Sequence, residues 1–398
     1  MQPAVKTSTN ENYAALQDID WTRLEWRREL RNNITTVDAL KMYLPLTAAE
    51  EADLRRVTDI HPMNIPRYYL SLVNPDDPDD PIRRLCVPDA AELVVAGAMG
   101  ATTADPYGDD KHDKGNGLLH KYSYTALVVT SEYCAMYCRH CFRKRMVGLS
   151  NELTVKNFQN AAAYIADHPE ITNAILSGGD PFMLPTRVLE KMLAALVDIP
   201  HLNHVRIGSR VPVSYPLRLF DDDLMALLED FNNRKTLFVP THFNHAREIT
   251  PASREAVRRL RRCGITVNNQ AVLLRGVNDT VEALVDLMNG LLRIGVNPYY
   301  LYQCMPVARV RHHFQVPLKE GIAVVDRARR YFDGYAKRFK YIIGHDIGKL
   351  EICGRIGDKV ILKQLHARNG NEEEVSRLLV RELTDTGGWL DDLPETSL

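Results

Sequence analysis

From residue 125 onward, short apolar runs alternate with longer segments in which apolar residues recur every three or four positions. A short apolar run is typical of a buried strand, and the longer period is typical of an amphipathic helix. Strands that alternate with helices predict parallel βαβ units with right-handed crossovers. Six units fall short of the eight of a closed barrel, so we expect an α/β fold with a partial (β/α)6 barrel. The expected strands are 126–130, 174–176, 205–208, 237–241, 267–273 and 299–303.

The helices expected between these strands have clear apolar faces and start signals. Thr250-Pro251 is an N-cap followed by a first-turn proline. The faces are Val155, Phe158, Ala162 and Ile165 after Thr154; Val188, Leu189, Met192, Leu193 and Leu196; and Leu284, Leu287, Met288 and Leu291 after Asp279.

Residues 1–118 read as an N-terminal helical and wrapping arm ahead of the barrel at 119–310. The first 15 residues are polar and predict disorder, and the pattern over 20–44 predicts a helix. Thr47 and Glu50 have the spacing of a capping box. The stretch 62–118 is rich in Pro, Asp and Gly and predicts a long wrapping loop. Its acidic run, 74–81, is expected to be a solvated face rather than a metal site.

Residues 311–398 read as a C-terminal α+β extension. A helix is expected over 322–332, followed by short strands at 341–343, 350–353 and 359–365. The acidic, polar end, 382–398, predicts a loose tail.

Composition narrows the class of protein. The chain has 398 residues, 45% hydrophobic and 25% charged, as in an ordinary soluble globular protein. A formal net charge of -1 gives no general attraction to nucleic acid or membrane. No apolar h-region marks export, and no apolar run reaches the roughly 20 residues of a membrane span. Seven cysteines without paired spacing favour a reducing cytoplasm.

The strongest chemical signal is Cys134-Ala-Met-Tyr-Cys138-Arg-His-Cys141, directly after the first strand. Iron–sulfur clusters normally have four cysteine ligands, so three leave one iron open to a reactant. The following Arg143-Lys-Arg can balance the cluster's charge or bind an anionic substrate group. A structural zinc site and three unrelated thiols are the alternatives, but zinc usually needs a second ligand pair. The spacing resembles that of the radical S-adenosylmethionine (SAM) enzymes, which generate a 5′-deoxyadenosyl radical.

Two further motifs follow the second and third strands. Gly178-Gly179-Asp180 allows a backbone to approach a ligand closely, and Asp180 can accept from an ammonium group. In the radical SAM enzymes this position binds the amino group of SAM. Ser209-Arg210 ends the third strand, where Arg210 can pair with SAM's carboxylate. A surface arginine is the alternative.

Several longer runs of the chain carry a second resemblance. They are 20–32, 45–47, 206–210, 241–245, 269–279 and 298–304. Together, over roughly residues 20–365, they resemble the lysine 2,3-aminomutase family. Members of that family bind pyridoxal 5′-phosphate (PLP), link it to the substrate amino group, and move that group between adjacent carbons through a radical.

The resemblance implies roles for matching positions. His140 would lie against the adenine of SAM, while His242 and Gln270 would contact its ribose or methionine. Arg143 would bind the substrate carboxylate. Tyr302 would lie near the PLP ring, and Lys349 falls where the family has its Schiff-base lysine.

The sequence departs from the family at the PLP and substrate positions. Thr125 replaces an arginine expected to bind the PLP phosphate, and Lys121 can supply part of that charge. Two carboxylates that hold the distal ammonium of lysine are replaced by Met305 and Ile342. A glycine-rich run before Lys349 is altered, and a C-terminal zinc-binding cysteine cluster is reduced to Cys353.

The sequence therefore predicts a cytoplasmic, homo-oligomeric radical SAM aminomutase with a [4Fe-4S] cluster, SAM and PLP. The expected reaction is 2,3-migration of the amino group on a free α-amino acid other than lysine. Reduced flavodoxin or ferredoxin is the expected electron donor, with no nucleic acid or membrane partner. The alternatives are a PLP-independent radical SAM epimerase, lyase or dehydrogenase and, from another class, an iron–sulfur electron-transfer protein.

Overall fold

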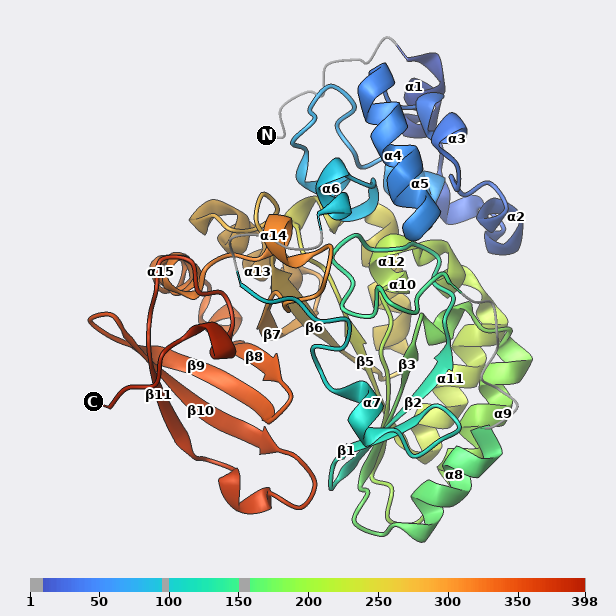
Figure 1. Ribbon diagram of the computed structural model, residues 1–398. Coiled ribbons are helices and arrows are strands. Elements are labelled where there is room, and N and C mark those ends of the chain that lie inside the picture. The colour runs from blue at the N-terminus through green and yellow to red at the C-terminus, as the bar shows by residue number, and fades with distance from the viewer. Residues whose placement is uncertain (1–9, 95–99, 150–157, 398) are drawn as a thin grey trace.

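One eleven-stranded sheet organises the computed structural model, which describes residues 10–94, 100–149 and 158–397 (Figure 1). Its strands lie side by side in chain order, from β1 to β11. Strands β2 to β8 run parallel, whereas β1 and β9 to β11 pair antiparallel with their neighbours. The strands are β1 Leu118–Tyr122, β2 Thr125–Ser131, β3 Asn173–Gly178, β4 His204–Ile207, β5 Thr236–Thr241, β6 Thr266–Leu273, β7 Asn297–Gln303, β8 Lys340–His345, β9 Gly348–Ile356, β10 Lys359–Ala367 and β11 Leu378–Glu382.

The six predicted barrel strands are confirmed as β2 to β7. Successive side chains of each strand point to opposite faces of the sheet. One set packs under the helices, and the other faces the interior of the partial barrel. In β4, Val205 and Ile207 are fully buried, while Arg206 between them is partly exposed. Strand β8 adds a further parallel strand beside β7, and the sheet stays open. The predicted boundaries at 118 and 310 stay predictions.

Helices cover the outer face of the parallel strands, as in a βαβ fold (Figure 1). Thr250 and Thr280 cap α12 and α13 through their hydroxyl groups, as the sequence predicted for the first. The predicted start of the first helix at Thr154 and Val155 lies outside the described residues. The helices are α8 Phe158–Asp167, α9 Thr186–Val197, α10 Val211–Ser214, α11 Asp222–Arg234, α12 Pro251–Arg262, α13 Val281–Arg293, α14 Arg311–Phe314 and α15 Leu318–Ala328, with 3-10 turns at Pro181–Met183, Pro216–Phe220, Ala246–Glu248 and Gly334–Arg338.

The N-terminal arm corrects three expectations. Residues 11–17 form a helix instead of being disordered, because Asn10 caps it and Tyr13 and Leu16 are buried. The single helix expected over 20–44 is broken, since Ile34 forms a backbone bridge with Ile65. The arm consists of α1 Glu11–Gln17, α2 Trp26–Leu30, α3 Val37–Lys41, α4 Ala48–Ile60, α5 Arg67–Leu70, α6 Pro81–Cys86 and α7 Asp109–His112, with 3-10 turns at Trp21–Arg23 and Ala90–Leu93.

In the acidic run 74–81, Asp76 and Asp79 are exposed as expected, and the third correction concerns only Asp80. Asp80 is not solvated: it is fully buried, caps α6 and pairs with Arg247. The predicted capping box of Thr47 and Glu50 is confirmed at the start of α4.

The C-terminal end is packed, which corrects the loose tail expected from its polar composition. Trp389, Leu390 and Leu393 are buried, and Asp392 forms an ion pair with the buried Arg311. Isolated apolar residues in a polar run gave no periodic signal, so the tail could not be recognised as docked. Strands β9 to β11 form the antiparallel meander predicted in part at 350–353 and 359–365, and further 3-10 turns lie at Glu372–Glu374 and Leu390–Asp392. Among the helices of the described residues, none is long and apolar enough to cross a membrane.

Candidate active site

The cysteine loop, residues 134–141, follows β2 and is hydrogen-bonded to residues of the N-terminal arm. Asn64 donates its side-chain amide to the Cys134 carbonyl (3.0 Å), and Asn33 donates to the Ala135 carbonyl (2.9 Å). The backbone N–H of Tyr137 in turn donates to the Asn64 carbonyl (3.0 Å). These bonds explain why a wrapping arm precedes the barrel: it shapes the loop that carries the thiols.

A buried ion triad fixes the far side of the same loop. Glu92 accepts from Arg139 at 2.7 and 2.5 Å and from Lys144 at 2.6 Å, and all three residues are buried. Burial raises the pKa of Glu92, but the two cations outweigh that effect and lower it to about 2. Sequence analysis did not single out this triad, because an ion pair between distant segments has no local signal.

The thiols of the cysteine loop are buried close enough to influence one another's ionisation. Burial raises the pKa values of Cys134 and Cys141, and neighbouring thiols of the loop add to both shifts. Within the described residues, no three His, Cys, Asp or Glu side chains are placed to hold a single metal ion. Thiols spaced in this way suit a cluster, in which each thiolate binds a different iron.

Gly178 and Gly179 are required by the approach of β3 to the cysteine loop. A Cβ on Gly178 would lie 2.4 Å from the Ser131 carbonyl oxygen, and one on Gly179 would lie 2.3 Å from that of Tyr133. Gly178 also has a positive φ of 115°, which residues other than glycine rarely adopt. The motif therefore positions the residues that lead into Cys134.

Asp180 is placed beside Ser209 and Arg210, as predicted, but its carboxylate has protein donors. It accepts from the Ser209 hydroxyl (2.7 Å) and from the backbone N–H groups of Arg210 (2.8 Å), Val211 (3.2 Å) and Phe182 (3.1 Å). Burial nevertheless raises its pKa to about 6. Asp180 thus joins the loops after β3 and β4. Whether it also contacts SAM stays a prediction.

Arg210 reaches from the end of β4 to the cysteine loop. It pairs with the fully buried Glu248 (2.7 Å) and lies 2.7 Å from the Cys138 sulfur. Its charge is therefore placed where a thiolate-ligated cluster would need it. Glu248 was not predicted from the sequence.

His140 lies in the cysteine loop, His242 directly follows β5, and Gln270 lies in β6, which pairs with β5. The Nδ1 of His242 hydrogen-bonds the Gln270 carbonyl (2.8 Å), and burial lowers the pKa of His242 to about 4. His140 packs edge-on against Phe314, and its Nε2 lies 3.4 Å from the Asn244 amide. Both rings are buried enough to stay neutral, which suits contact with an uncharged base or ribose.

Comparison with known proteins decides the family. Residues 128–288 match the Radical SAM superfamily. The chain is 38% identical over 359 residues to a putative L-lysine 2,3-aminomutase of Aquifex aeolicus, covering 89% of this chain and 94% of that protein. It is 39% identical over 326 residues to the L-lysine 2,3-aminomutase of Clostridium subterminale, covering 82% and 76%. The chain belongs to the lysine 2,3-aminomutase family of radical SAM enzymes.

Membership makes the chain an enzyme with a [4Fe-4S] cluster and SAM, which excludes a simple electron carrier. Substrate varies among relatives. The glutamate 2,3-aminomutase of Clostridioides difficile is 34% identical over 318 residues, covering 80% of this chain and 73% of that protein. The side chain of this enzyme's substrate must therefore be inferred from the residues at the predicted substrate positions.

Arg143, the family position for the substrate carboxylate, is buried beside two polar groups. It donates to the Ser177 hydroxyl (3.0 Å) and lies 3.4 Å from the Asp109 carboxylate. Asp109 begins α7, which Gly108 introduces with a positive φ of 71°. This aminomutase thus carries a carboxylate of its own next to the predicted carboxylate site. Sequence analysis missed it inside an acidic loop.

The predicted distal positions are apolar and closely packed. Ile342 is fully buried on β8 beside Tyr302 of β7. A Cβ on Gly344 would lie 3.0 Å from Met305 and 2.9 Å from the ring of Tyr107. Tyr107 also lies 6.4 Å, centroid to centroid, from Phe142 of the cysteine loop. The predicted distal positions are therefore surrounded by aromatic and aliphatic groups.

Lys349 and Tyr302 face the barrel interior from β9 and β7. The Lys349 amine lies 5.0 Å from the centroid of the Tyr300 ring, and Tyr300 packs edge-on against Tyr302. Burial, together with Arg206 and Lys121, lowers the pKa of Lys349 to about 7. A lysine amine that is partly neutral at pH 7 is suited to attack a carbonyl.

The two residues considered for the phosphate differ in how free they are. Lys121 donates to the carbonyls of Tyr107 (2.5 Å) and His345 (3.0 Å), so two of its three N–H groups are taken. The Thr125 hydroxyl donates to Asn173 (3.1 Å), and Arg206 extends toward the same amide and hydroxyl. Arg206 belongs to a run quoted for the family but had no predicted role.

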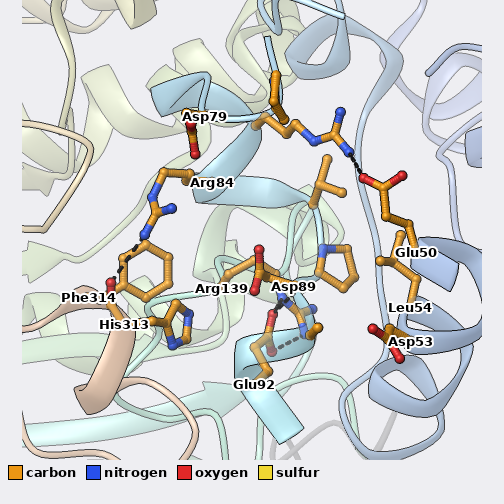
Figure 2. Close-up of a pocket in the computed structure, with 15 residues that line it drawn as sticks. Glu50, Asp53, Leu54, Asp79, Arg84, Asp89, Glu92, Arg139, His313 and Phe314 are labelled. Carbon is orange, nitrogen blue, oxygen red and sulfur yellow. Dashed lines mark hydrogen bonds and ion pairs between the residues drawn. The ribbon is translucent and has the colours of Figure 1, made fainter. Parts of the chain in front are cut away.

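A separate cavity of about 220 Å³ lies between the arm and the barrel (Figure 2). Arg84 lies over Phe314 on one side, 5.6 Å from the ring centroid, and Glu50 and Leu54 of α4 line the other. None of the residues predicted for SAM, PLP or substrate lines it. The buried Glu92–Arg139 pair forms part of its wall, so the cavity adjoins the support of the cysteine loop rather than the barrel interior.

Proposed function

We propose that this enzyme is a PLP-dependent 2,3-aminomutase acting on a free α-amino acid with an apolar or neutral side chain. The observation that carries the proposal is Lys349: an amine inside the barrel, with no carboxylate partner among the described residues. Its lowered pKa favours the neutral, nucleophilic form.

The residues around Lys349 fit PLP. Lys349 supplies the amine for the cofactor's carbonyl, Tyr302 and Tyr300 supply aromatic surface, and Arg206 has a buried Nε without a hydrogen-bond partner among the described residues. When bound, PLP supplies a conjugated ring over which an unpaired electron next to the migrating nitrogen can spread. The protein's share is to hold, orient and keep water from the reacting groups.

The substrate class follows from charge. Arg143 is the cation for the α-carboxylate, and the wall of Met305, Ile342 and Tyr107 contains no acid. The two nearby acids already have cationic partners: Asp109 lies beside Arg143, and Asp346 pairs with Lys111 (2.7 Å). A distal ammonium would therefore be desolvated without a partner, which costs several kcal/mol.

The test is to purify the protein with PLP, reduce with borohydride, and map the modified peptide. We expect a pyridoxyl group on Lys349 and none on Lys121. In parallel, the reduced enzyme is incubated with SAM and single amino acids, and 5′-deoxyadenosine and β-amino acid are quantified. An unmodified Lys349 in protein that still cleaves SAM would favour the PLP-independent alternatives. We infer that reduced flavodoxin or ferredoxin supplies the electron.

A further inference from the structure

Besides Lys121, whose amine is held by two backbone carbonyls, two cations face the barrel interior without an acid. Lys349 projects from β9 and Arg206 from β4, and neither forms an ion pair with any residue that the structure describes. Glu351, the next inward acid along β9, is already bound by Lys340 (2.6 Å). Burial, and then Arg206, lower the pKa of Lys349, so the two charges act on one another.

Arg206 is held in a fixed orientation but is only partly satisfied. Its Nη2 donates to the Asn173 side-chain oxygen and lies 3.5 Å from the Thr125 hydroxyl. Asn173 is itself fixed, since its amide donates to the Tyr124 carbonyl (2.8 Å). The Nε of Arg206 is buried and has no hydrogen-bond partner among the described residues. A buried donor without an acceptor is destabilising, and a protein keeps one where a ligand supplies the acceptor.

The other cations near the interior are occupied. Lys121 donates to two backbone carbonyls, Arg143 lies against Ser177 and Asp109, and Arg210 is paired with Glu248. Since Arg143 is assigned to the substrate carboxylate, Arg206 is left as an interior guanidinium with a buried N–H that has no partner among the described residues. The planar fork of an arginine matches the oxygens of a phosphate group, which a lysine can bind only as a point charge.

We propose that Arg206 binds the phosphate group of the cofactor whose carbonyl reacts with Lys349. The assignment rests on the proposed function. It places the phosphate contact on β4, with Thr125 and Asn173 orienting the guanidinium from β2 and β3. The phosphate would satisfy the Nε of Arg206 and bring negative charge to an interior that holds two cations.

The test compares PLP with pyridoxal, which has the same ring and aldehyde but no phosphate. Binding of each compound to the full-length, cluster-reconstituted protein is measured by equilibrium dialysis, for the wild type, Arg206→Gln and the control Arg338→Gln. Arg338 is an exposed arginine, and it donates to the side chain of Asn297 at the start of β7 (3.4 Å). We expect Arg206→Gln to weaken PLP binding at least tenfold and to change pyridoxal binding less than twofold. Arg338→Gln should change neither.

Equal binding of PLP to wild type and Arg206→Gln would overturn the assignment while leaving the proposed function intact. Equal losses for PLP and pyridoxal would also overturn it, since the effect would not depend on phosphate. No uptake of either compound by the wild type would overturn the proposed function and this assignment together. A second measurement needs no variant: inorganic phosphate should weaken PLP binding to the wild type but not pyridoxal binding, and a failure to compete counts against Arg206 as the anchor.

Discussion

Around the cysteine loop the buried cations have carboxylate partners, whereas the two cations inside the barrel have none among the described residues. At this rim of the barrel, formed by the cysteine loop and the residues that contact it, Arg139 and Lys144 share Glu92, and Arg210 pairs with Glu248. In the interior, Lys349 packs over an aromatic ring and Arg206 contacts only uncharged partners. Both regions bury positive charge, but they balance it differently.

The difference teaches which charges build the scaffold and which await a ligand. A buried pair is costly to break, because the remaining partner keeps its charge without a counterion. Such a pair therefore fixes the loop on which it lies. An unpaired cation lowers the stability of the free protein and gains favourable interactions when an anion binds. Substitutions in the two regions should consequently have opposite effects on stability.

The largest effect is expected at the rim itself, from replacing a predicted cluster ligand. Cys134→Ala, Cys138→Ala or Cys141→Ala should abolish binding of the [4Fe-4S] cluster and hence SAM cleavage. Iron and sulfide content and 5′-deoxyadenosine formation measure the loss. Cys263→Ala is the control, since Cys263 lies in the core and contacts the Met225 carbonyl. A similar loss of iron in that variant would show that the ligand assignment is wrong.

Breaking the triad should come next. Glu92→Gln leaves Arg139 and Lys144 buried without a carboxylate and should lower the free energy of unfolding by about 3–5 kcal/mol. Denaturant unfolding measures it, and iron content should fall as the loop loosens. Glu255→Gln removes the partly exposed partner of Arg258 and Arg259 on the surface of α12 and should cost less than about 1 kcal/mol. If both variants lost the same small amount, the triad would not be a structural brace.

Sequence alone predicted the parallel sheet, because alternation and length identify buried strands one by one. It also predicted that the cysteine loop, Gly178 and Gly179 and Arg210 would meet, since residues after parallel strands gather at one edge. It did not predict Glu92, Glu248 or Asp109 as partners. Each joins segments far apart in the chain, and such pairing has no period and no local motif.

Arg206 shows the same limit in another form. Its inward direction follows from alternation with Val205 and Ile207, but its lack of an acid partner appears only when the whole interior is assembled. The docked C-terminal tail was missed because Trp389 and Leu390 are too few to form a periodic pattern. Helix breaks in the arm, such as that at Ile34, likewise depend on a distant bridge.

Substrate choice tests whether the apolar wall is as uncharged as it looks. L-lysine should be turned over at least tenfold more slowly than amino acids with apolar side chains, because its ammonium would be desolvated opposite Met305 and Ile342. Competition assays with amino acid mixtures and mass spectrometry of the products measure the ratio. Lysine turnover equal to that of apolar amino acids would mean that Asp109 or Asp346 leaves its present partner to bind the ammonium.

The sharpest contrast with Glu92 is expected at Lys349. Its pKa falls from the ordinary 10.5 to about 7, through burial first and then Arg206 and Lys121. Between these values the unfolded chain binds a proton at this lysine that the folded chain does not, so this group makes stability rise with pH. Below about pH 7 both states are protonated, and the full penalty of the buried charge is present.

Lys349→Met removes that penalty, so the PLP-free variant should be more stable than the PLP-free wild type, although it loses the reactive amine. The gain in free energy of unfolding should be largest below about pH 7 and should shrink toward zero as the pH approaches 10.5. Urea unfolding across this range measures it. In Arg206→Gln the pH range over which Lys349 changes the stability should narrow, because removing the neighbouring charge moves the pKa of Lys349 back toward 10.5. A variant that is less stable than the wild type at every pH would mean that the Lys349 stem contributes more by packing than its charge costs. The interior would then be balanced like the rim, and the contrast between the two regions would be lost.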